Sequence, residues 1–290
     1  MTAVVLVAHR QRPEAASLAR VAATWLHERG HRVWMVPGDA EAIGTDDLAD
    51  DAPPAHAGLV VCLGGDGTVL RSVHLLDGAP VPIIGVNVGQ LGYLTEVEPH
   101  AMLEALERHL ARPGGTPADG WHVEERMLLD VTVLGRNGAG DQRFRALNEG
   151  VLEKLEPGHT VRLRVRIDGV DFTSYAADGL IMATPTGSTA YSLSARGPVV
   201  SPRHRALLLT PVSPHMLFDR SLVLDPAECI EVEVGGHRAV VLSVDGQRTA
   251  TLGAGDVVRV AASSSTARFV RFGQHRFHQI LKAKFGLADR

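Results

Sequence analysis

The sequence is poor in cysteine, in aromatic residues and in net charge. It contains 290 residues, of which only Cys62 and Cys229 are cysteines, and aromatic residues make up 4 %. Two distant cysteines cannot form a disulfide framework or a Cys-x-x-Cys metal site, so the pattern predicts a reducing, cytoplasmic location, with one long-range disulfide as the alternative. Because aromatic side chains are scarce, we expect a core of Val, Leu, Ile and Ala.

Strong charge and long apolar runs are also missing. The 29 Lys and Arg residues nearly balance the 33 Asp and Glu residues, and the formal net charge is −4 at pH 7. This balance gives no general attraction to nucleic acid or acidic lipid. No apolar run approaches the roughly 20 residues of a membrane-spanning helix, and residues 1–7 lack the pattern of a signal peptide. We therefore expect neither nucleic acid nor a membrane among the partners.

The first part of the chain alternates between strand and helix patterns. Continuous apolar runs predict buried strands at residues 4–8, 59–63 and 81–86, with a further strand at 31–36. A helical period predicts helices at residues 14–29, 68–76 and 102–110, and residues 40–54 are expected to form a surface connection with a short helix. This alternation is typical of an α/β domain with a parallel sheet covered on both faces.

The pattern changes after a breaker cluster at residues 113–117, which predicts a linker. Short alternating runs then predict strands at residues 128–134, 161–167, 230–234, 240–244 and 257–261. Asp168-Gly169 and Asp245-Gly246 are turn signals between them. We therefore predict an α/β domain at 1–118 and an all-β domain at 119–267. A helix at 277–285 is expected to return, within residues 268–290, to the first domain.

Glycines cluster in the segment Gly64-Gly65-Asp66-Gly67-Thr68, between a predicted strand and a helix. Glycine lets the backbone approach a ligand, and N–H groups at a helix N-terminus suit phosphate. The segment lacks the Gly-Lys-[Ser/Thr] ending of a Walker A loop, and Leu70 replaces the third glycine of a dinucleotide fingerprint. A negative carboxylate beside a phosphate is unfavourable unless it has a function. That function is either binding Mg²⁺ or accepting a proton from a hydroxyl nucleophile. The alternative is an aspartate that caps the following helix.

Three further segments are candidates for a nucleotide site. Residues 178–194 join a short apolar strand to a segment rich in hydroxyl groups with one tyrosine, which is able to hold a planar base. The alternative is a solvated Ser/Thr-rich loop. Asn148-Glu149 suits a sugar diol or a carboxamide, although for this pair taken alone a surface turn is the favoured interpretation. Residues 85–94 form either a wall of the same cleft or a tight connection.

Together these segments, in this order, resemble the NAD kinase family. The first motif alone is not specific, since diacylglycerol kinases, sphingosine kinases and 6-phosphofructokinases have similar glycine–aspartate loops, whereas the stretch 178–198 is more specific. The resemblance implies an α/β N-terminal domain and a β-rich, NAD-binding C-terminal domain. It also implies transfer of a phosphoryl group to the 2′-hydroxyl of the adenosine ribose of NAD, giving NADP.

The resemblance also implies the roles of individual residues. Asp66 is the expected proton acceptor. The expected nucleotide-binding residues are Gly64, Gly65, Gly67, Thr68, Arg71, Asn148, Glu149, Asp178, Thr186, Thr189, Ala190, Tyr191, Ser192, Leu193, Ser194, Ser213 and Gln247. The donor is ATP or polyphosphate, and Mg²⁺ is expected to arrive with the donor instead of at a metal site of the protein. A homodimer or homotetramer is expected.

A departure from the family pattern and three alternative functions accompany this interpretation. The family usually has glycine where this chain has Arg196, a change that either reshapes the adenine site, meets a phosphate, or is a tolerated surface change. A lipid kinase would share the glycine–aspartate loop but should present an apolar lipid cleft, which nothing in the sequence indicates. A non-catalytic nucleotide sensor would keep the fold, although the intact Asp66 argues against it. A dehydrogenase is disfavoured because the dinucleotide fingerprint is missing.

Overall fold

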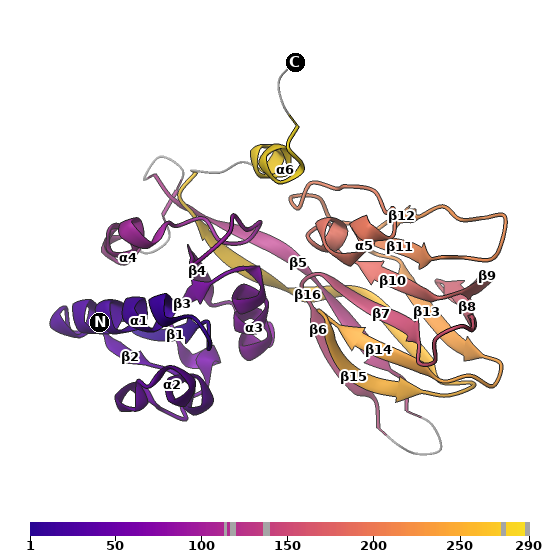
Figure 1. The fold of residues 1–290 in the computed structure, drawn as a ribbon, viewed down its shortest axis with the longest axis horizontal. Helices are drawn as coiled ribbons and strands as arrows, with labels where there is room; N and C mark the ends of the chain where they lie inside the picture. The colour runs from indigo at the N-terminus through magenta and orange to yellow at the C-terminus, as the bar shows by residue number, and fades with distance from the viewer. Residues whose placement is uncertain (113–114, 117–119, 136–139, 274–276, 288–290) are drawn as a thin grey trace. The chain divides into compact units, whose positions relative to one another are not determined.

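The chain forms two compact units in the computed structural model (Figure 1). The structure describes residues 1–112, 115–116, 120–135, 140–273 and 277–287. One unit comprises Met1–Glu125 with Ala267–Arg290, and the other comprises Arg126–Thr266. The chain passes between them within two long strands, β5 (His122–Val133) and β16 (Val257–Arg271). Of the predicted linker, residues 113, 114 and 117 lie outside the described residues.

A parallel sheet forms the centre of the first unit, as predicted. Its strands are β1 (Ala3–Ala8), β2 (Arg32–Trp34), β3 (Leu59–Gly64) and β4 (Pro82–Asn87), in the order β2-β1-β3-β4. Neighbours in this order are parallel, and the end of β16 pairs parallel with β4 through Phe269 and Ile83. The carboxyl ends of β1, β3 and β4 therefore lie at one edge, where α/β folds bind ligands.

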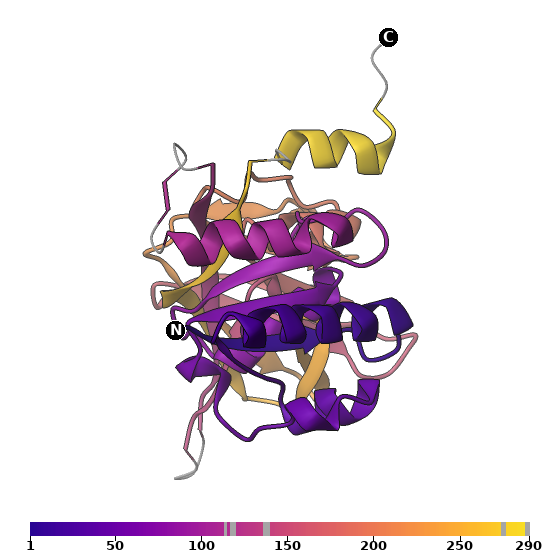
Figure 2. The ribbon, with the colours of Figure 1, turned by 90° about the vertical axis from the view of Figure 1, so that its left-hand side faces the viewer.

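Helices cover both faces of this sheet. They are α1 (Pro13–Glu28), α2 (Pro37–Ile43), α3 (Asp66–Leu76) and α4 (Met102–Ala111), with 3₁₀ turns η1 (Asp46–Leu48), η2 (Pro54–His56) and η3 (Pro99–Ala101), and the unit also contains α6 (Phe277–Phe285). The helices α1 and α4 lie in front of the strands in Figure 2, and their apolar residues share a core with Leu6 and Val61. Cys62 points to the opposite face, where it contacts Ser72 of α3.

Two antiparallel sheets form the second unit, which confirms the predicted all-β class. The first has the order β16-β13-β8-β9, with β5 beside β16 and β6 beside β5, and the second has the order β12-β11-β10-β7-β14-β15. The new strands are β6 (Gln142–Ala146), β7 (Glu149–Lys154), β8 (Val161–Ile167), β9 (Val170–Ala177), β10 (Gly179–Ala183), β11 (Leu207–Val212), β12 (Leu222–Leu224), β13 (Cys229–Gly235), β14 (Val240–Val244) and β15 (Gln247–Leu252). Leu163 and Val232 of the first sheet share one buried core with Leu180 and Leu242 of the second.

Cys62 is buried in β3 of the first unit, and Cys229 is half-buried at the start of β13 in the second. Cys62 and Cys229 are both free, so the alternative of a disulfide between them is wrong for this structure. Burial raises the pKa of the Cys62 thiol to about 12, which makes the thiol unreactive at neutral pH. Over the described ranges, no helix combines the length and apolar character needed to cross a membrane.

Candidate functional site

The glycine–aspartate loop joins β3 to α3. The helix begins at Asp66, two residues before the predicted start, because the N–H groups of Thr68 and Val69 both donate to the carbonyl of Gly65. A Cβ on Gly64 would lie 2.2 Å from Thr68 Oγ1, so this position requires glycine. A Cβ on Gly65 or Gly67 would meet no atom within 4 Å. The loop therefore offers open backbone at the N-terminus of α3.

Asp66 does not cap its own helix. Its carboxylate accepts hydrogen bonds from the backbone N–H groups of Tyr93 (2.9 Å, at Oδ2) and Leu94 (3.0 Å, at Oδ1). A Cβ on Gly92 would lie 2.3 Å from Asp66 Oδ1. The capping alternative is therefore wrong, and the segment after β4 is wrapped around this carboxylate. Each oxygen keeps lone pairs for a further donor.

Two buried polar atoms accompany this carboxylate. Thr95 Oγ1 and Asn87 Oδ1 have no hydrogen-bond partner among the described residues. The Thr95 hydroxyl is close to Asp66, since a Cβ on Gly92 would lie 2.7 Å from it. Buried polar atoms almost always have partners, so these two are available to a ligand or to water. From the sequence, Asn87 was predicted only as a member of the candidate segment 85–94. Thr95 was not predicted, because no sequence motif marks this residue.

Arg71 has a partner inside the protein. It pairs with the buried Asp39 and donates to the carbonyl of Ala8 (2.6 Å), while Arg10 Nε also donates to Asp39 (3.0 Å). Two guanidinium groups on one buried carboxylate compensate the cost of burying its charge. Arg71 thus ties α3 to the end of β1, and its predicted contact with a nucleotide stays a prediction.

In the second unit, Asn148 and Glu149 contact the hydroxyl-rich segment through the backbone. The carbonyl of Asn148 accepts from the N–H of Thr184 (2.8 Å), and Thr184 Oγ1 donates to the carbonyl of Leu147 (2.6 Å). A Cβ on Gly187 would lie 2.1 Å from the Asn148 carbonyl oxygen. The pair is therefore no isolated surface turn, because it is packed against the start of the second motif.

Glu149 is a buried acid beside a second carboxyl group. Only 6 % of the residue is exposed, and Oε2 has no hydrogen-bond partner in the described part of the chain. Burial, with the nearby Asp245 as the second cause, raises its pKa to about 8, against the opposing effect of the Tyr191 backbone N–H. This shift favours the protonated form of Glu149, in which the carboxyl group is able to donate a hydrogen bond.

The hydroxyl-rich segment is largely buried, so the solvated-loop alternative is wrong. It forms the 3₁₀ turn η5 (Gly187–Thr189) and the short helix α5 (Tyr191–Ser194). Thr186 is 7 % exposed and accepts a hydrogen bond from the buried Arg126 (3.3 Å). Ser192 Oγ pairs with Thr210 Oγ1 (3.2 Å) inside the unit, whereas Ser194 is exposed. These hydroxyls differ in role, and Ser192 holds the segment against β11.

Tyr191 and Asp178 each pair with one of two consecutive residues at the end of β7. The Tyr191 hydroxyl donates to Glu153 Oε1 (2.6 Å), and Lys154 Nζ pairs with Asp178 Oδ1 (2.7 Å). Burial and the hydrogen bond to Glu153 raise the pKa of Tyr191 to about 12, so the phenol stays neutral. Neither Glu153 nor Lys154 was singled out from the sequence, because a charged pair at the end of a strand has no distinctive pattern.

The remaining predicted residues lie near those already placed. Ser213 follows Val212, whose carbonyl accepts from the N–H of Asp178 (2.9 Å). Gln247 is the first residue of β15 and comes directly after the turn that contains Asp245. Thr189, Ala190 and Leu193 are half-buried within the hydroxyl-rich segment. Asp66 with its loop belongs to the first unit, and Glu149, Asp178 and residues 186–194 belong to the second.

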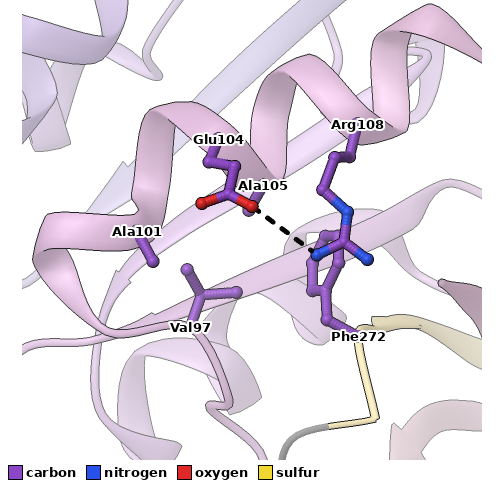
Figure 3. A pocket seen from close by; sticks show the side chains of 6 residues that line it. All are labelled: Val97, Ala101, Glu104, Ala105, Arg108 and Phe272. Carbon is purple, nitrogen blue, oxygen red and sulfur yellow. Dashed lines mark ion pairs between the residues drawn. The ribbon is translucent and has the colours of Figure 1, made fainter. Parts of the chain in front are cut away.

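The pocket drawn in Figure 3 is lined by none of these residues and lies within the first unit, beside α4. Its lining is Val97, Ala101, Glu104, Ala105, Arg108 and Phe272. The Arg108 guanidinium stands 5.1 Å from the centre of the Phe272 ring and pairs with Glu104 at 4.0 Å. The cavity volume is about 20 Å³, enough for roughly one water molecule. We assign no ligand to it.

Arg196 lies in the left-handed backbone region, with φ at 67°, and is exposed. A non-glycine residue there is strained, whereas glycine is not. Arg196→Gly is therefore expected to raise the free energy of unfolding by about 0.5–1 kcal/mol, measured by urea denaturation. Arg203→Gly is the matched control, since Arg203 is also exposed but has no positive φ, and it should be neutral or destabilising. Destabilisation by Arg196→Gly would contradict the strain argument.

Comparison with family models covers most of the chain. Residues 4–113 match the ATP-NAD kinase N-terminal domain, and residues 147–272 match the ATP-NAD kinase C-terminal domain. The chain is 38 % identical to an NAD kinase of Heliobacterium modesticaldum over 98 % of both chains. It is 36 % identical to an NAD kinase of Syntrophotalea carbinolica over 96 % of both.

Solved structures show the same fold. A crystal structure of yeast NADH kinase complexed with NADH matches with a TM-score of 0.88 and 26 % identity, over all of this chain and 89 % of that one. An NAD kinase from Archaeoglobus fulgidus in complex with ATP matches with a TM-score of 0.72 and 24 % identity, over 99 % of both chains. The second likeness supports the fold alone.

Proposed function

Since this chain belongs to the NAD kinase family, we propose that it phosphorylates the 2′-hydroxyl of the adenosine ribose of NAD, giving NADP, with ATP or another phosphoryl donor. NAD kinase activity itself follows from 36–39 % sequence identity to NAD kinases over nearly the full length of the chain. The choice of hydroxyl, the donor and the roles of single residues are our proposal. The observation that carries it is the Asp66 carboxylate, held by two backbone N–H groups beside an open glycine loop.

Asp66 is the proposed proton acceptor for the attacking hydroxyl. Phosphoryl transfer depends mainly on positioning and charge stabilisation, and a carboxylate that accepts the proton as the oxygen attacks completes this arrangement. The backbone on both sides, at Gly65 and Gly67, has room for phosphate oxygens. The N-terminus of α3 supplies N–H groups and a positive dipole end for the donor.

The second unit is the proposed site of NAD. Asn148 and Glu149 offer an amide and an acid to the ribose or the nicotinamide side, and Asp178 is the proposed polar contact beside Tyr191. Residues 186–194 supply a partly buried surface for adenine and its ribose. The similar yeast NADH kinase forms a complex with NADH, so the reduced form is a second proposed acceptor.

A divalent cation is the proposed cofactor. Within the described ranges, no three His, Cys, Asp or Glu side chains gather as ligands for a metal ion. Mg²⁺ needs no such group, because it keeps several waters and binds largely through substrate phosphates. We therefore propose that Mg²⁺ arrives with the donor and neutralises phosphate charge. Homodimeric or homotetrameric assembly and the cytoplasmic location also remain proposals.

The test is a coupled assay with the purified chain, Mg²⁺, and NAD or NADH, with ATP or polyphosphate as donor. We expect NADP to appear with NAD and ATP, measured through an NADP-dependent dehydrogenase. Omitting Mg²⁺ should abolish turnover. Formation of no NADP(H) with any donor, despite NAD binding in calorimetry, would instead support the nucleotide-sensor alternative.

A further inference from the structure

The turn between β14 and β15 contains an aspartate that the reaction described above does not use. Asp245 has φ at 46°, and Gly246 has φ at 77°. The flanking residues Val244 and Gln247 pair with each other, so these two residues form the whole connection of the hairpin. Asn-Gly serves a two-residue turn with two positive φ values at least as well as Asp-Gly. The turn alone therefore does not explain a carboxylate at this position.

The Asp245 side chain holds the backbone of residues 147–149. Its Oδ2 accepts from the N–H of Leu147 (2.8 Å), and its Oδ1 accepts from those of Asn148 (2.8 Å) and Glu149 (3.1 Å). Both carboxylate oxygens are needed, because asparagine has only one acceptor and would turn its NH₂ group toward an N–H donor. Asp245 is itself buried, so these hydrogen bonds are shielded from water.

The charge of the same carboxylate also acts on the Glu149 side chain. Glu149 starts β7, and two groups from other elements act on its acid: the Asp245 charge from the β14–β15 turn and the Tyr191 backbone N–H from α5. Burial and Asp245 favour the protonated acid, and the Tyr191 N–H opposes them. Glu149 Oε2 is buried and has no partner among the described residues, so a proton there has no acceptor in the described part of the protein.

We propose that Asp245 is a positioning residue of the NAD site, which fixes the backbone of residues 147–149 and keeps Glu149 a hydrogen-bond donor to the bound nucleotide. This inference rests on the proposed function, because Asn148 and Glu149 are the residues it positions for NAD. It predicts that Glu149 binds an acceptor atom of NAD as a neutral acid, in contrast to an anionic Glu149 that would accept from ribose hydroxyls.

Asp245→Asn is the decisive variant, and Asp168→Asn is its matched control. Asp168 also stands in an Asp-Gly turn, with φ at 50°, and accepts one backbone hydrogen bond from Cys229 (2.8 Å). Asparagine keeps the left-handed turn in both hairpins. We expect Asp245→Asn to raise the KM for NAD roughly tenfold or more, with a smaller effect on kcat. For Asp168→Asn we expect less than about a twofold change in either constant.

The pH dependence of NAD binding separates positioning from mere stability. In the wild type, the Kd for NAD should increase as pH rises through about 8, where Glu149 loses its proton. In Asp245→Asn the neighbouring charge is absent, so the pKa of Glu149 falls and the increase in Kd begins at a lower pH. Glutamine cannot ionise, so the Kd of Glu149→Gln should not change between pH 7 and 9. Calorimetric titration with NAD measures all three.

Several outcomes would overturn the inference while leaving the proposed function intact. One is that the wild type is active but Asp245→Asn and Asp168→Asn change the KM for NAD by the same factor. Another is a wild-type Kd that decreases as pH rises, which would show that Glu149 binds as an anion. If Asp245→Asn fails to fold, the Glu149→Gln titration still decides the form of Glu149. A wild type that makes no NADP would instead contradict the proposed function itself.

Discussion

Replacing Asp66 by asparagine is expected to lower kcat by a factor of roughly 10²–10⁴, the usual contribution of a general base. Asparagine has nearly the same shape but cannot take the proton of the attacking hydroxyl. Its amide also accepts from only one of the Tyr93 and Leu94 N–H groups, so the loop after β4 should loosen slightly. The measurement is the rate of NADP formation at saturating NAD and ATP, with thermal unfolding to confirm the fold.

Two controls isolate the loss of the base. Asp51→Asn removes an exposed carboxylate from the same unit and should leave kcat unchanged. The Kd for NAD separates the two effects within Asp66→Asn, because loss of the base lowers kcat alone, whereas a displaced loop would also weaken binding. Near-normal turnover of Asp66→Asn would show that this carboxylate is not the proton acceptor.

Replacing Gly187 by alanine is expected to destabilise the second unit by about 3 kcal/mol or more, at the upper end of the usual cost of overpacking. The added Cβ would lie 2.1 Å from the Asn148 carbonyl oxygen and 2.6 Å from its carbonyl carbon. These are backbone atoms, which cannot rotate away as a side chain does. Either the segment 184–187 or the strand end at Asn148 must move. NADP formation should therefore fall together with the unfolding midpoint in urea.

Gly253→Ala is the matched control in the same unit. Its Cβ would have its nearest neighbour, Asp256 Oδ2, at 3.9 Å, an ordinary van der Waals distance. The change should shift the free energy of unfolding by less than about 0.5 kcal/mol and leave turnover as in the wild type. Equal stability of the Gly187→Ala and Gly253→Ala variants would contradict the close packing of Gly187 on Asn148.

The elements that the sequence predicted best are those with a local apolar pattern. The run Leu59–Leu63 and the helical period from residue 14 have enough apolar residues to indicate a buried strand and a helix by themselves. Strands such as β6 (Gln142–Ala146) and β15 (Gln247–Leu252) were not predicted. Most of their residues are exposed or half-buried, so these strands have no clear apolar pattern. Their place is set by pairing with neighbours far along the chain, a tertiary effect that overrides weak propensity.

The sequence by itself determined the two fold classes, the glycine–aspartate loop and the family, since each depends on residue types at short spacing. The tertiary structure decided what holds the key carboxyl groups. Asp66 is fixed by N–H groups 27 and 28 residues away, and Asp245 holds the backbone 96 to 98 residues away. Every residue except proline has the same backbone N–H group, so the residue type does not reveal which N–H will donate to a given carboxylate. Only the folded chain brings each donor to its carboxylate.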